Sequence, residues 1–420
     1  MKVFKFGGAS VKDSAGIKNV AEIIKRYAED KTLVIVSATG KTTNALEEVI
    51  KAYYTESTEA AIKKIEPVKE NHLQICNGLF EDYSAPIYSQ IDAVFKELYQ
   101  LVENPKSNNY NLDYDQIVSK GELLSSIILS SYLNHAGLKN QWLDIRTVLK
   151  TDNSYREGIV DWKQSTDLCN QILNPLLHNQ TVVAQGFIGQ APDGTTTTLG
   201  REGSDYTAAI FANLLDAESQ TIWKDVPGVM SGDPRKFQDT VLIDELTYLE
   251  AVEMTYYGAS VIHPKTIKPI QNKGIPLLVK SFINPEGKGT VIHNTNVAIK
   301  YPPVKVLKEN QVLLTFHTKD FSFVPDDTVG ELLKAFSSAA LRANMLQTGA
   351  ISLQTVVDNI PEKIEKVVAS VSDNFNIQKE EGLSILTIRN YNDEVINYYN
   401  LNKQIILTQK RASTYQILFN

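Results

Sequence analysis

A lysine and two glycines mark the end of the first predicted strand. Val3–Phe6 has the apolar character of a buried strand, yet it contains Lys5 and runs directly into Gly7 and Gly8. A core disfavours an unpaired ammonium, and a strand interior disfavours glycine. Glycines at a strand end let backbone N–H groups approach a phosphate, and a helix predicted from about residue 13 or 14 would add its positive end. The spacing therefore predicts an anion site; the alternative is a tight turn from which Lys5 reaches solvent.

A second polar group stands just before an amphipathic helical pattern. Residues 200–205 read Gly-Arg-Glu-Gly-Ser-Asp. Ser204 or Asp205 could simply cap the helix, and capping is the simpler explanation for either one. Capping does not account for Arg201, whose guanidinium suits a carboxylate. We therefore expect a carboxylate-binding loop here.

A third group follows the strand predicted at residues 220–223. Lys224 and Asp225 come directly after it and lead into a Pro/Gly loop that ends at Arg235. A loop that leaves the carboxyl end of a strand is where a nucleotide base and ribose would rest. The alternative is an ordinary surface loop.

The composition limits the classes of protein to consider. The chain has 420 residues, of which 43% are hydrophobic and 22% charged, as in soluble globular proteins with more than one domain. A net charge of −7 argues against general affinity for nucleic acid. Cys76 and Cys169 form no disulfide framework or zinc site, and the six histidines show no ligand spacing. With no apolar run long enough for a signal peptide or membrane span, we expect a cytoplasmic protein.

Predicted strands alternate with helical patterns as far as about residue 295. The predicted strands are 3–6, 32–38, 141–145, 181–188, 220–223 and 275–281. This alternation predicts an α/β domain with a mainly parallel central sheet, whose ligands lie at the carboxyl ends of the strands.

The pattern changes near residue 300. Strand-like and helix-like segments then follow in the order βαββαβ, and a partial copy comes after them. The segments are 312–316, 328–342, 350–357, 361–371 and 383–388, with 405–408 and 414–419 in the partial copy. We therefore place a domain boundary here, giving domains of 1–298 and 299–420.

Several motifs occur in one order along the first domain. They are KFGGAS at the N-terminus, VSATGKTTNAL (36–46), KGELLSS (120–126), LGREGSDYTAA (199–209), DVPGVMSGDPR (225–235) and YGASVIHPKTI (257–267). This series resembles the aspartate kinases (aspartokinases) of the amino acid kinase family. The tail resembles the regulatory βαββαβ modules called ACT domains. The resemblance implies a three-layer kinase domain, followed by one ACT-like module and an abbreviated second.

The resemblance also implies a reaction. ATP would phosphorylate the side-chain carboxylate of L-aspartate to give 4-phospho-L-aspartate and ADP, the first step towards lysine, threonine and methionine. A carboxylate with a reference pKa of about 4 is already ionised at neutral pH, so no histidine base is needed. Catalysis then reduces to alignment and to neutralisation of oxygen charge, for which a lysine, glycine N–H groups and Mg²⁺ are suitable.

The motifs assign roles to individual residues. Lys5 and Asp205 would be catalytic. Lys5 would bind and stabilise the transferring phosphoryl group, and Asp205 would hold the lysine and the phosphate site in register rather than act as a base. Glu122 would meet the α-ammonium of aspartate, although it could instead be a first-turn glutamate favoured by the helix dipole. The remaining substrate-binding residues would be Ser37, Thr43, Arg201 and Ser204. The residues around ATP would be Lys5, Gly7, Gly8, Ser10, Lys224, Asp225, Met230 and Arg235.

Within the first domain, the sequence departs from the family pattern at three positions. Ala9 replaces the usual threonine, Glu202 the usual glycine and Ser260 a common lysine. The change at Ser260 removes a cation that would face the nucleotide. Our hypothesis is that Lys224, beside Asp225, partly replaces it.

Two other functions stay open at this point. The chain could be an amino acid kinase for a different acid, such as N-acetylglutamate or glutamate, or an amino-acid-sensing protein without activity. Residues 342–353 resemble an effector-facing strand pair, so lysine or threonine could be an effector. Alternatively, the tail could serve dimerisation. A homodimer or higher homo-oligomer is expected from the family, with no nucleic-acid or membrane partner.

Overall fold

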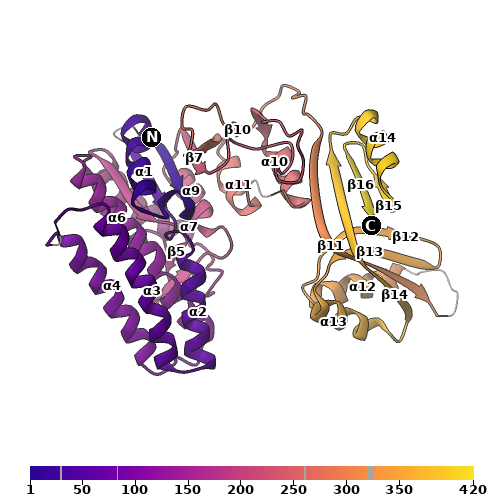
Figure 1. Ribbon diagram of the computed structural model, residues 1–420, viewed down its shortest axis with the longest axis horizontal. Helices are drawn as coiled ribbons and strands as arrows, with labels where there is room; N and C mark the ends of the chain where they lie inside the picture. The colour runs from indigo at the N-terminus through magenta and orange to yellow at the C-terminus, as the bar shows by residue number, and fades with distance from the viewer. Residues whose placement is uncertain (29–30, 83, 260–261, 320–325) are drawn as a thin grey trace. The chain divides into compact units, whose positions relative to one another are not determined.

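The computed structural model describes residues 1–28, 31–82, 84–259, 262–319 and 326–420. The chain packs as two compact units, coloured along the chain in Figure 1. The first unit contains Met1–Val229, Asp244–Val252 and Ile262–Ala298. The second contains Met230–Ile243, Glu253–Val261 and Ile299–Asn420. Each unit is therefore built from more than one stretch of sequence.

The first unit is organised around an eight-stranded sheet of order β3-β4-β2-β1-β7-β9-β10-β8. Its strands are β1 (Lys2–Phe6), β2 (Thr32–Val36), β3 (Asn140–Leu143), β4 (Thr181–Gln185), β7 (Ser219–Lys224), β8 (Glu245–Thr247), β9 (Leu277–Ser281) and β10 (Thr290–His293). Every neighbouring pair is parallel except β9 and β10. The predicted mainly parallel sheet is confirmed.

One predicted strand is in fact two. The expected strand 181–188 ends at Gln185 as β4, and β5 (Ile188–Gln190) then pairs with β6 (Thr196–Thr198) in a separate hairpin. Phe187, between β4 and β5, has a φ of 70°. A left-handed residue cannot continue an extended strand, so the apolar run breaks here.

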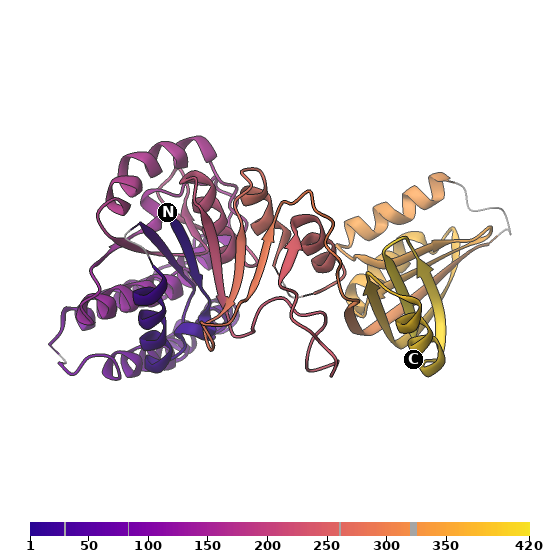
Figure 2. The ribbon, with the colours of Figure 1, turned by 90° about the horizontal axis from the view of Figure 1, so that it is seen from above.

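Helices cover both faces of this sheet, as Figure 2 shows. The helices of this unit are α1 (Ser14–Tyr27), α2 (Thr42–Thr55), α3 (Thr58–Asn77), α4 (Pro86–Glu103), α5 (Tyr110–Val118), α6 (Lys120–His135), α7 (Trp162–Leu168), α8 (Asn174–Leu177), α9 (Gly203–Leu214) and α11 (Pro264–Gln271). Helix α10 (Tyr248–Tyr256) begins in this unit and ends in the second. Helix α6 packs on β2, β3 and β4, whereas α9 packs on β1, β2 and β7 and also contacts α11. The expected three-layer arrangement is confirmed.

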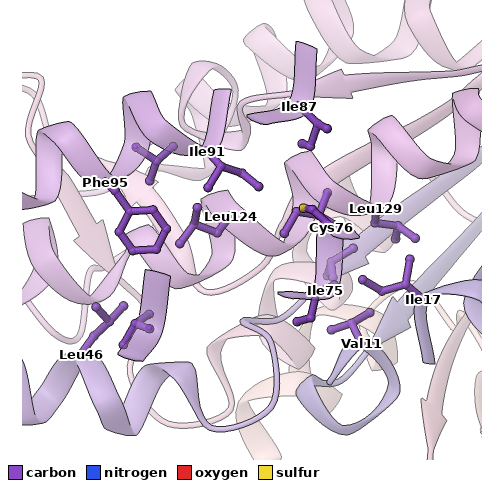
Figure 3. Close-up of a cluster of buried hydrophobic side chains, with 14 of the residues drawn as sticks. Val11, Ile17, Leu46, Ile75, Cys76, Ile87, Ile91, Phe95, Leu124 and Leu129 are labelled. Carbon is purple, nitrogen blue, oxygen red and sulfur yellow. The ribbon is translucent and has the colours of Figure 1, made fainter. Parts of the chain in front are cut away.

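The main apolar core of this unit joins β1 and β2 to the helices before β3. All five residues of β2 are buried, as expected for a continuous apolar run in a parallel sheet. Figure 3 shows Ile17 of α1, Ile75 of α3 and Leu129 of α6 converging on one another, with side chains of α2 and α4 in the same cluster. This packing fixes β1 and β2, whose carboxyl ends carry the predicted site residues.

The start of α1 was predicted correctly, but another element precedes it. The Asp13 carboxylate accepts a hydrogen bond of 2.7 Å from the Gly16 N–H and caps α1. Between the glycines and this cap lies a short 3₁₀ helix, Gly8–Val11. The turn that starts at the glycines is therefore this 3₁₀ helix and not α1.

The second unit contains a six-stranded antiparallel sheet of order β12-β13-β11-β14-β16-β15. Its strands are β11 (Val304–Thr318), β12 (Ala343–Thr348), β13 (Ser352–Asp358), β14 (Phe375–Arg389), β15 (Ile405–Lys410) and β16 (Thr414–Phe419). Its helices are α12 (Asp326–Ser338), α13 (Pro361–Val371) and α14 (Asp393–Asn402). Apolar residues of α12 and α13 pack against β11 in one buried cluster.

Strands β11 and β14 are longer than expected, at 15 residues each. Their pairing shifts register between Lys308 and Leu313, where Asn310 has a φ of 55°. The succession β11-α12-β12-β13-α13-β14 is the predicted βαββαβ order, and α14, β15 and β16 extend it beyond β14. The ACT-like fold is confirmed, while the boundary between residues 298 and 299 stays a prediction.

No helix within the described ranges combines the length and apolar character needed to cross a membrane.

Candidate active site

The carboxyl end of β1 and the start of α9 open onto one pocket of about 740 Å³ in the first unit. Residues from widely separated motifs line it together. Eight of the predicted site residues are among them: Lys5, Gly8, Ser37, Thr43, Glu122, Arg201, Ser204 and Asp205. The pocket therefore gathers every predicted catalytic and substrate-binding residue.

A buried ion pair lies in this pocket. The Lys5 Nζ is 2.6 Å from Oδ1 of Asp205, and the two side chains are 11% and 5% exposed. The alternative in which Lys5 reaches free solvent is therefore wrong. Because a buried charge without a partner is costly, the Asp205 carboxylate holds the Lys5 ammonium in place.

Gly8 permits a close approach between the loops after β1 and β2. A Cβ atom on Gly8 would lie 2.6 Å from the Ala38 carbonyl oxygen and 2.9 Å from that of Gly40. The Gly40 N–H donates to the Gly8 carbonyl over 3.0 Å. Only glycine fits at this position.

Gly7 and Ser10 are placed differently from Gly8, and neither lines the pocket. Gly7 has a φ of −79°, which any residue can adopt, and a Cβ there would only contact the Lys5 Nζ at 3.5 Å. Ser10 is fully buried, and its hydroxyl donates to the Gly7 carbonyl over 2.6 Å. The Ser10 hydroxyl thus closes the 3₁₀ turn.

Glu122 carries a buried carboxylate on the first turn of α6. Its Oε1 accepts a hydrogen bond of 3.2 Å from the Ala38 N–H, and its Oε2 has no hydrogen-bond partner within the described structure. Burial raises the pKa of Glu122 to about 8, against the opposing effects of the Ala38 N–H and the Lys5 charge. A half-satisfied carboxylate in a pocket is suited to a cationic ligand.

The loop before α9 contains a left-handed residue that is not glycine. Glu202 has a φ of 54° and precedes the first residue of α9, and its carboxylate accepts a hydrogen bond of 3.0 Å from the His263 N–H. Neither Ser204 nor Asp205 caps the helix, so that interpretation was wrong. Glycine would be more stable than glutamate in this left-handed backbone conformation.

The residues predicted to surround ATP are not all brought to the pocket. Lys224 is the last residue of β7 and Asp225 follows it exposed, and neither lines the pocket. Met230 and Arg235 belong to the second unit, where Met230 bridges to Leu242 and Arg235 pairs with Asp233 at 2.8 Å. Ser260, the site of the missing lysine, lies outside the described residues.

Sequence reasoning missed several residues of the pocket, including Glu47, Tyr114, Arg156 and Phe187. Glu47 lies one helical turn after Thr43 in α2, a spacing that could have identified it. Arg156 and Phe187 lie in loops without a recognisable motif, and only the tertiary fold brings them here.

No group of three or more histidine, cysteine, aspartate or glutamate residues able to hold a metal ion occurs in the described part of the chain. The described residues therefore contain no candidate zinc-binding site of that kind.

Comparisons with known proteins agree with this geometry. Residues 1–281 match the amino acid kinase family. Lysine-sensitive aspartokinase 3 of Escherichia coli is 31% identical over 399 residues, covering 92% of this chain and 86% of that protein. A bifunctional aspartokinase/homoserine dehydrogenase of Arabidopsis thaliana is 34% identical over 69% of this chain, which spans only 32% of that relative.

Solved structures of E. coli aspartokinase III resemble the whole chain. The complex with aspartate and ADP (R-state) has a TM-score of 0.82 at 27% identity and covers 100% of this chain and 96% of that one. The complex with lysine and aspartate (T-state) has a TM-score of 0.85 at 28% identity, covering 100% and 95%. The chain therefore belongs to the amino acid kinase family and, within it, to the aspartokinases.

Proposed function

We propose that the protein transfers the γ-phosphoryl group of ATP to the side-chain carboxylate of L-aspartate, giving 4-phospho-L-aspartate and ADP. The observation that carries this proposal is one pocket holding a buried Lys5–Asp205 ion pair together with the half-satisfied carboxylate of Glu122. The first supplies a cation for phosphoryl oxygens, and the second an anion for an amino acid's ammonium. The names of the related aspartokinases support the same reaction.

The chemical step needs no proton transfer at the nucleophile. An ionised carboxylate oxygen of aspartate attacks the γ-phosphorus, a new P–O bond forms, and the bond to the β–γ bridging oxygen breaks to release ADP. The Lys5 ammonium neutralises charge on the transferring oxygens, while Asp205 holds that ammonium in register. Neither residue acts as a base.

The acceptor amino acid is held by its charged groups. Glu122 pairs with the α-ammonium, which replaces the missing partner of its Oε2. Arg201 and Ser204 bind a substrate carboxylate, and Ser37 and Thr43 line the same pocket. These contacts favour an amino acid with a free amine, which N-acetylglutamate lacks.

The nucleotide is bound on the other side of β1. Gly7 and Gly8 offer backbone N–H groups to the phosphates, with Ser10 completing their turn, and the exposed Asp225 after β7 borders the nucleotide. Mg²⁺ supplies neutralisation of phosphate charge when bound. A bound Mg²⁺ would be held mainly through the nucleotide phosphates and water, as is usual for this ion.

Lys224 partly replaces the cation that Ser260 does not supply. The Lys224→Ala variant should then raise the KM for ATP or lower kcat, while the exposed Lys139, which lies between α6 and β3 and outside the pocket, offers a Lys139→Ala control. Unchanged ATP kinetics in Lys224→Ala would contradict this role.

The remaining assignments concern the whole chain. We assign residues 1–298 to catalysis and 299–420 to an ACT-like regulatory region, in a cytoplasmic homodimer or higher homo-oligomer. The effector is an amino acid, lysine or threonine, and the name of the E. coli relative and its lysine-bound structure support lysine. Sedimentation and the assay below, repeated with each amino acid, test these assignments.

The function is tested by ATP consumption with L-aspartate, trapping the acyl phosphate as a hydroxamate. Aspartate-dependent turnover is the expected result. Turnover only with glutamate or N-acetylglutamate would reassign the substrate, and ligand binding without turnover would make the protein a sensor.

A further inference from the structure

In the described part of the first unit, two arginines direct no side-chain hydrogen bond or ion pair to the protein. This unit contains four arginines. Arg26 pairs with Glu286, and Arg146 pairs with Asp144 at 2.6 Å. Within the described residues, the guanidinium groups of Arg156 and Arg201 form neither an ion pair nor a hydrogen bond, and both line the pocket. An arginine in a pocket whose guanidinium N–H donors the protein does not use is suited to an anionic ligand.

The backbone of Arg156 is held by a buried carboxylate. Its N–H donates to Oδ2 of Asp115 over 2.9 Å. Asp115 is fully buried and also accepts hydrogen bonds from the N–H and the hydroxyl of Thr198, at 2.8 and 2.7 Å. Because Asp115 fixes both segments, the position of Arg156 is set by the fold and not by the loop alone.

The side chain of Arg156 is oriented as well. Its guanidinium carbon lies 4.2 Å from the centre of the Tyr114 ring. The Tyr114 hydroxyl in turn donates to Oε1 of Glu47 over 2.5 Å. Stacking on an aromatic face leaves the N–H donors at the guanidinium edge available to a ligand.

Arg156 and Arg201 belong to adjoining loops. A Cβ on Gly200, the residue before Arg201, would lie 3.1 Å from the Arg156 carbonyl oxygen. Gly200 has a φ of 75°, so this contact depends on glycine. The two arginines therefore enter the pocket from neighbouring backbone segments.

The sheet order tells which ligand Arg156 faces. β1 lies between β2 and β7, and Lys224 and Asp225 follow β7, on the nucleotide side. Tyr114 and Glu47 lie on α5 and α2, and α2 directly follows β2. Arg156 therefore lies on the opposite side from the nucleotide loop, with the residues proposed to hold the amino acid.

We propose that Arg156 is a further substrate-binding residue, which together with Arg201 binds the α-carboxylate of aspartate. The enzyme would then require an α-carboxylate in its acceptor. This inference rests on the proposed function. The backbone conformation of Arg156 supports the inference, since its φ is 69°, where glycine would be more stable. An arginine at such a position is explained by a ligand better than by the fold.

The test compares two acceptors in wild type, Arg156→Gly, Arg156→Lys and Arg156→Ala. The acceptors are L-aspartate and its α-amide, which keeps the amine and the side-chain carboxylate but lacks the α-carboxylate. We expect Arg156→Gly and Arg156→Ala to raise the KM for aspartate about 10- to 100-fold, the effect of losing a charged hydrogen bond. The preference for aspartate over the amide should shrink by a similar factor, and Arg156→Lys should restore part of it.

The controls separate binding from structure. Arg26→Ala, which removes an exposed arginine outside the pocket, should change neither acceptor's kinetics. The melting temperature of Arg156→Gly should equal or exceed that of wild type, because the left-handed backbone is relieved. A preference for aspartate over its amide that is unchanged in Arg156→Gly overturns the inference.

Calorimetric binding of L-aspartate distinguishes failure of this inference from failure of the proposed function. If the wild type is active and Arg156→Ala binds aspartate equally well, the inference fails and the function stands. If the wild type binds aspartate more tightly than Arg156→Ala but does not turn it over, the function fails and the arginine site stands. If neither protein binds aspartate, both proposals fail.

Discussion

Lys5 on β1 and Asp205 on α9 form a buried ion pair, with 2.6 Å between Nζ and Oδ1. The two residues lie 200 positions apart in sequence, so the central strand and the helix that packs on it must dock correctly before the pair can form. Formation of the ion pair thus depends on the docking of β1 and α9, and the pair is also part of the pocket.

Lys5→Met should lower both activity and stability. We expect kcat to fall about 10²- to 10³-fold, because a positioned cation for the transferring oxygens is lost. The free energy of unfolding should fall by about 3–5 kcal/mol, because Asp205 is left buried without its partner. Turnover assays and urea unfolding measure the two effects.

A double variant separates the effect of Lys5 on activity from its effect on stability. Lys5→Met with Asp205→Leu removes both charges, so much of the lost stability should return while activity stays low. Recovery of turnover in the double variant would show that the pair serves folding alone.

Aspartate binding should depend on the ionisation of Glu122. Burial raises its pKa to about 8, so in the free protein this carboxyl is largely protonated at neutral pH. Pairing with an ammonium requires the carboxylate, so binding should release a proton below about pH 8. We expect the Kd for aspartate to fall about tenfold per pH unit between about pH 6 and 8. Calorimetry in buffers of different ionisation enthalpy measures the released proton.

The same raised pKa makes the unliganded protein less stable as pH rises. Between the unfolded pKa of about 4.3 and the folded pKa of Glu122 of about 8, the folded state keeps a proton that the unfolded state has lost. Its contribution to the free energy of unfolding is therefore fully present at low pH and decreases through this window. Glu122→Gln should flatten both pH dependences; a wild-type Kd that is constant from about pH 6 to 8 would refute the role of Glu122.

Gly8→Ala and Gly7→Ala should differ sharply in stability. The added methyl at Gly8 would clash with the Ala38 and Gly40 carbonyls, whereas at Gly7 it meets only ordinary contact distance. We expect Gly8→Ala to lower the free energy of unfolding by about 1–3 kcal/mol, and Gly7→Ala to change it little. Equal values in chemical denaturation would mean that the two loops do not approach as described.

Glu202 allows backbone strain to be measured separately from its hydrogen bond. Both Glu202→Ala and Glu202→Gly lose the bond from the His263 N–H, but only glycine relieves the left-handed backbone. Glu202→Gly should therefore be more stable than Glu202→Ala by about 1 kcal/mol. Thermal unfolding of the two variants checks this, and an alanine variant that is the more stable one would contradict it.

The fold was predictable where apolar periodicity and length agree. β2 and α13 appear almost as predicted, because a fully buried run and a regular apolar stripe each allow one structure. β11 was predicted far too short, since its first half carries Lys305 and Lys308, which pair with β14 despite their polarity. Cross-strand pairing in a tertiary sheet overrides local composition there.

The site was predictable only where residues belong to motifs. Lys5, Glu122 and Asp205 each stand in a distinctive run, and the fold brings them together. Arg156 lies in a turn whose position depends on hydrogen bonds to the buried Asp115, a dependence that leaves no mark in the local sequence. The capping interpretation of Ser204 was wrong because Glu202, one residue before α9, already adopts a turn that begins the helix.

The discontinuous make-up of the second unit limits how a chimeric enzyme could be built. Its long strands carry Lys305, whose ammonium pairs with Asp239, and the nearly buried Arg389, which pairs with Glu253 at 2.8 Å. Both carboxylates come from chain segments that precede residue 299. A chimera that exchanged only the last 122 residues with a homologue would therefore leave two cations of the transplanted sheet without their carboxylate partners. The segments 230–243 and 253–261 of the donor would have to be exchanged together with those residues.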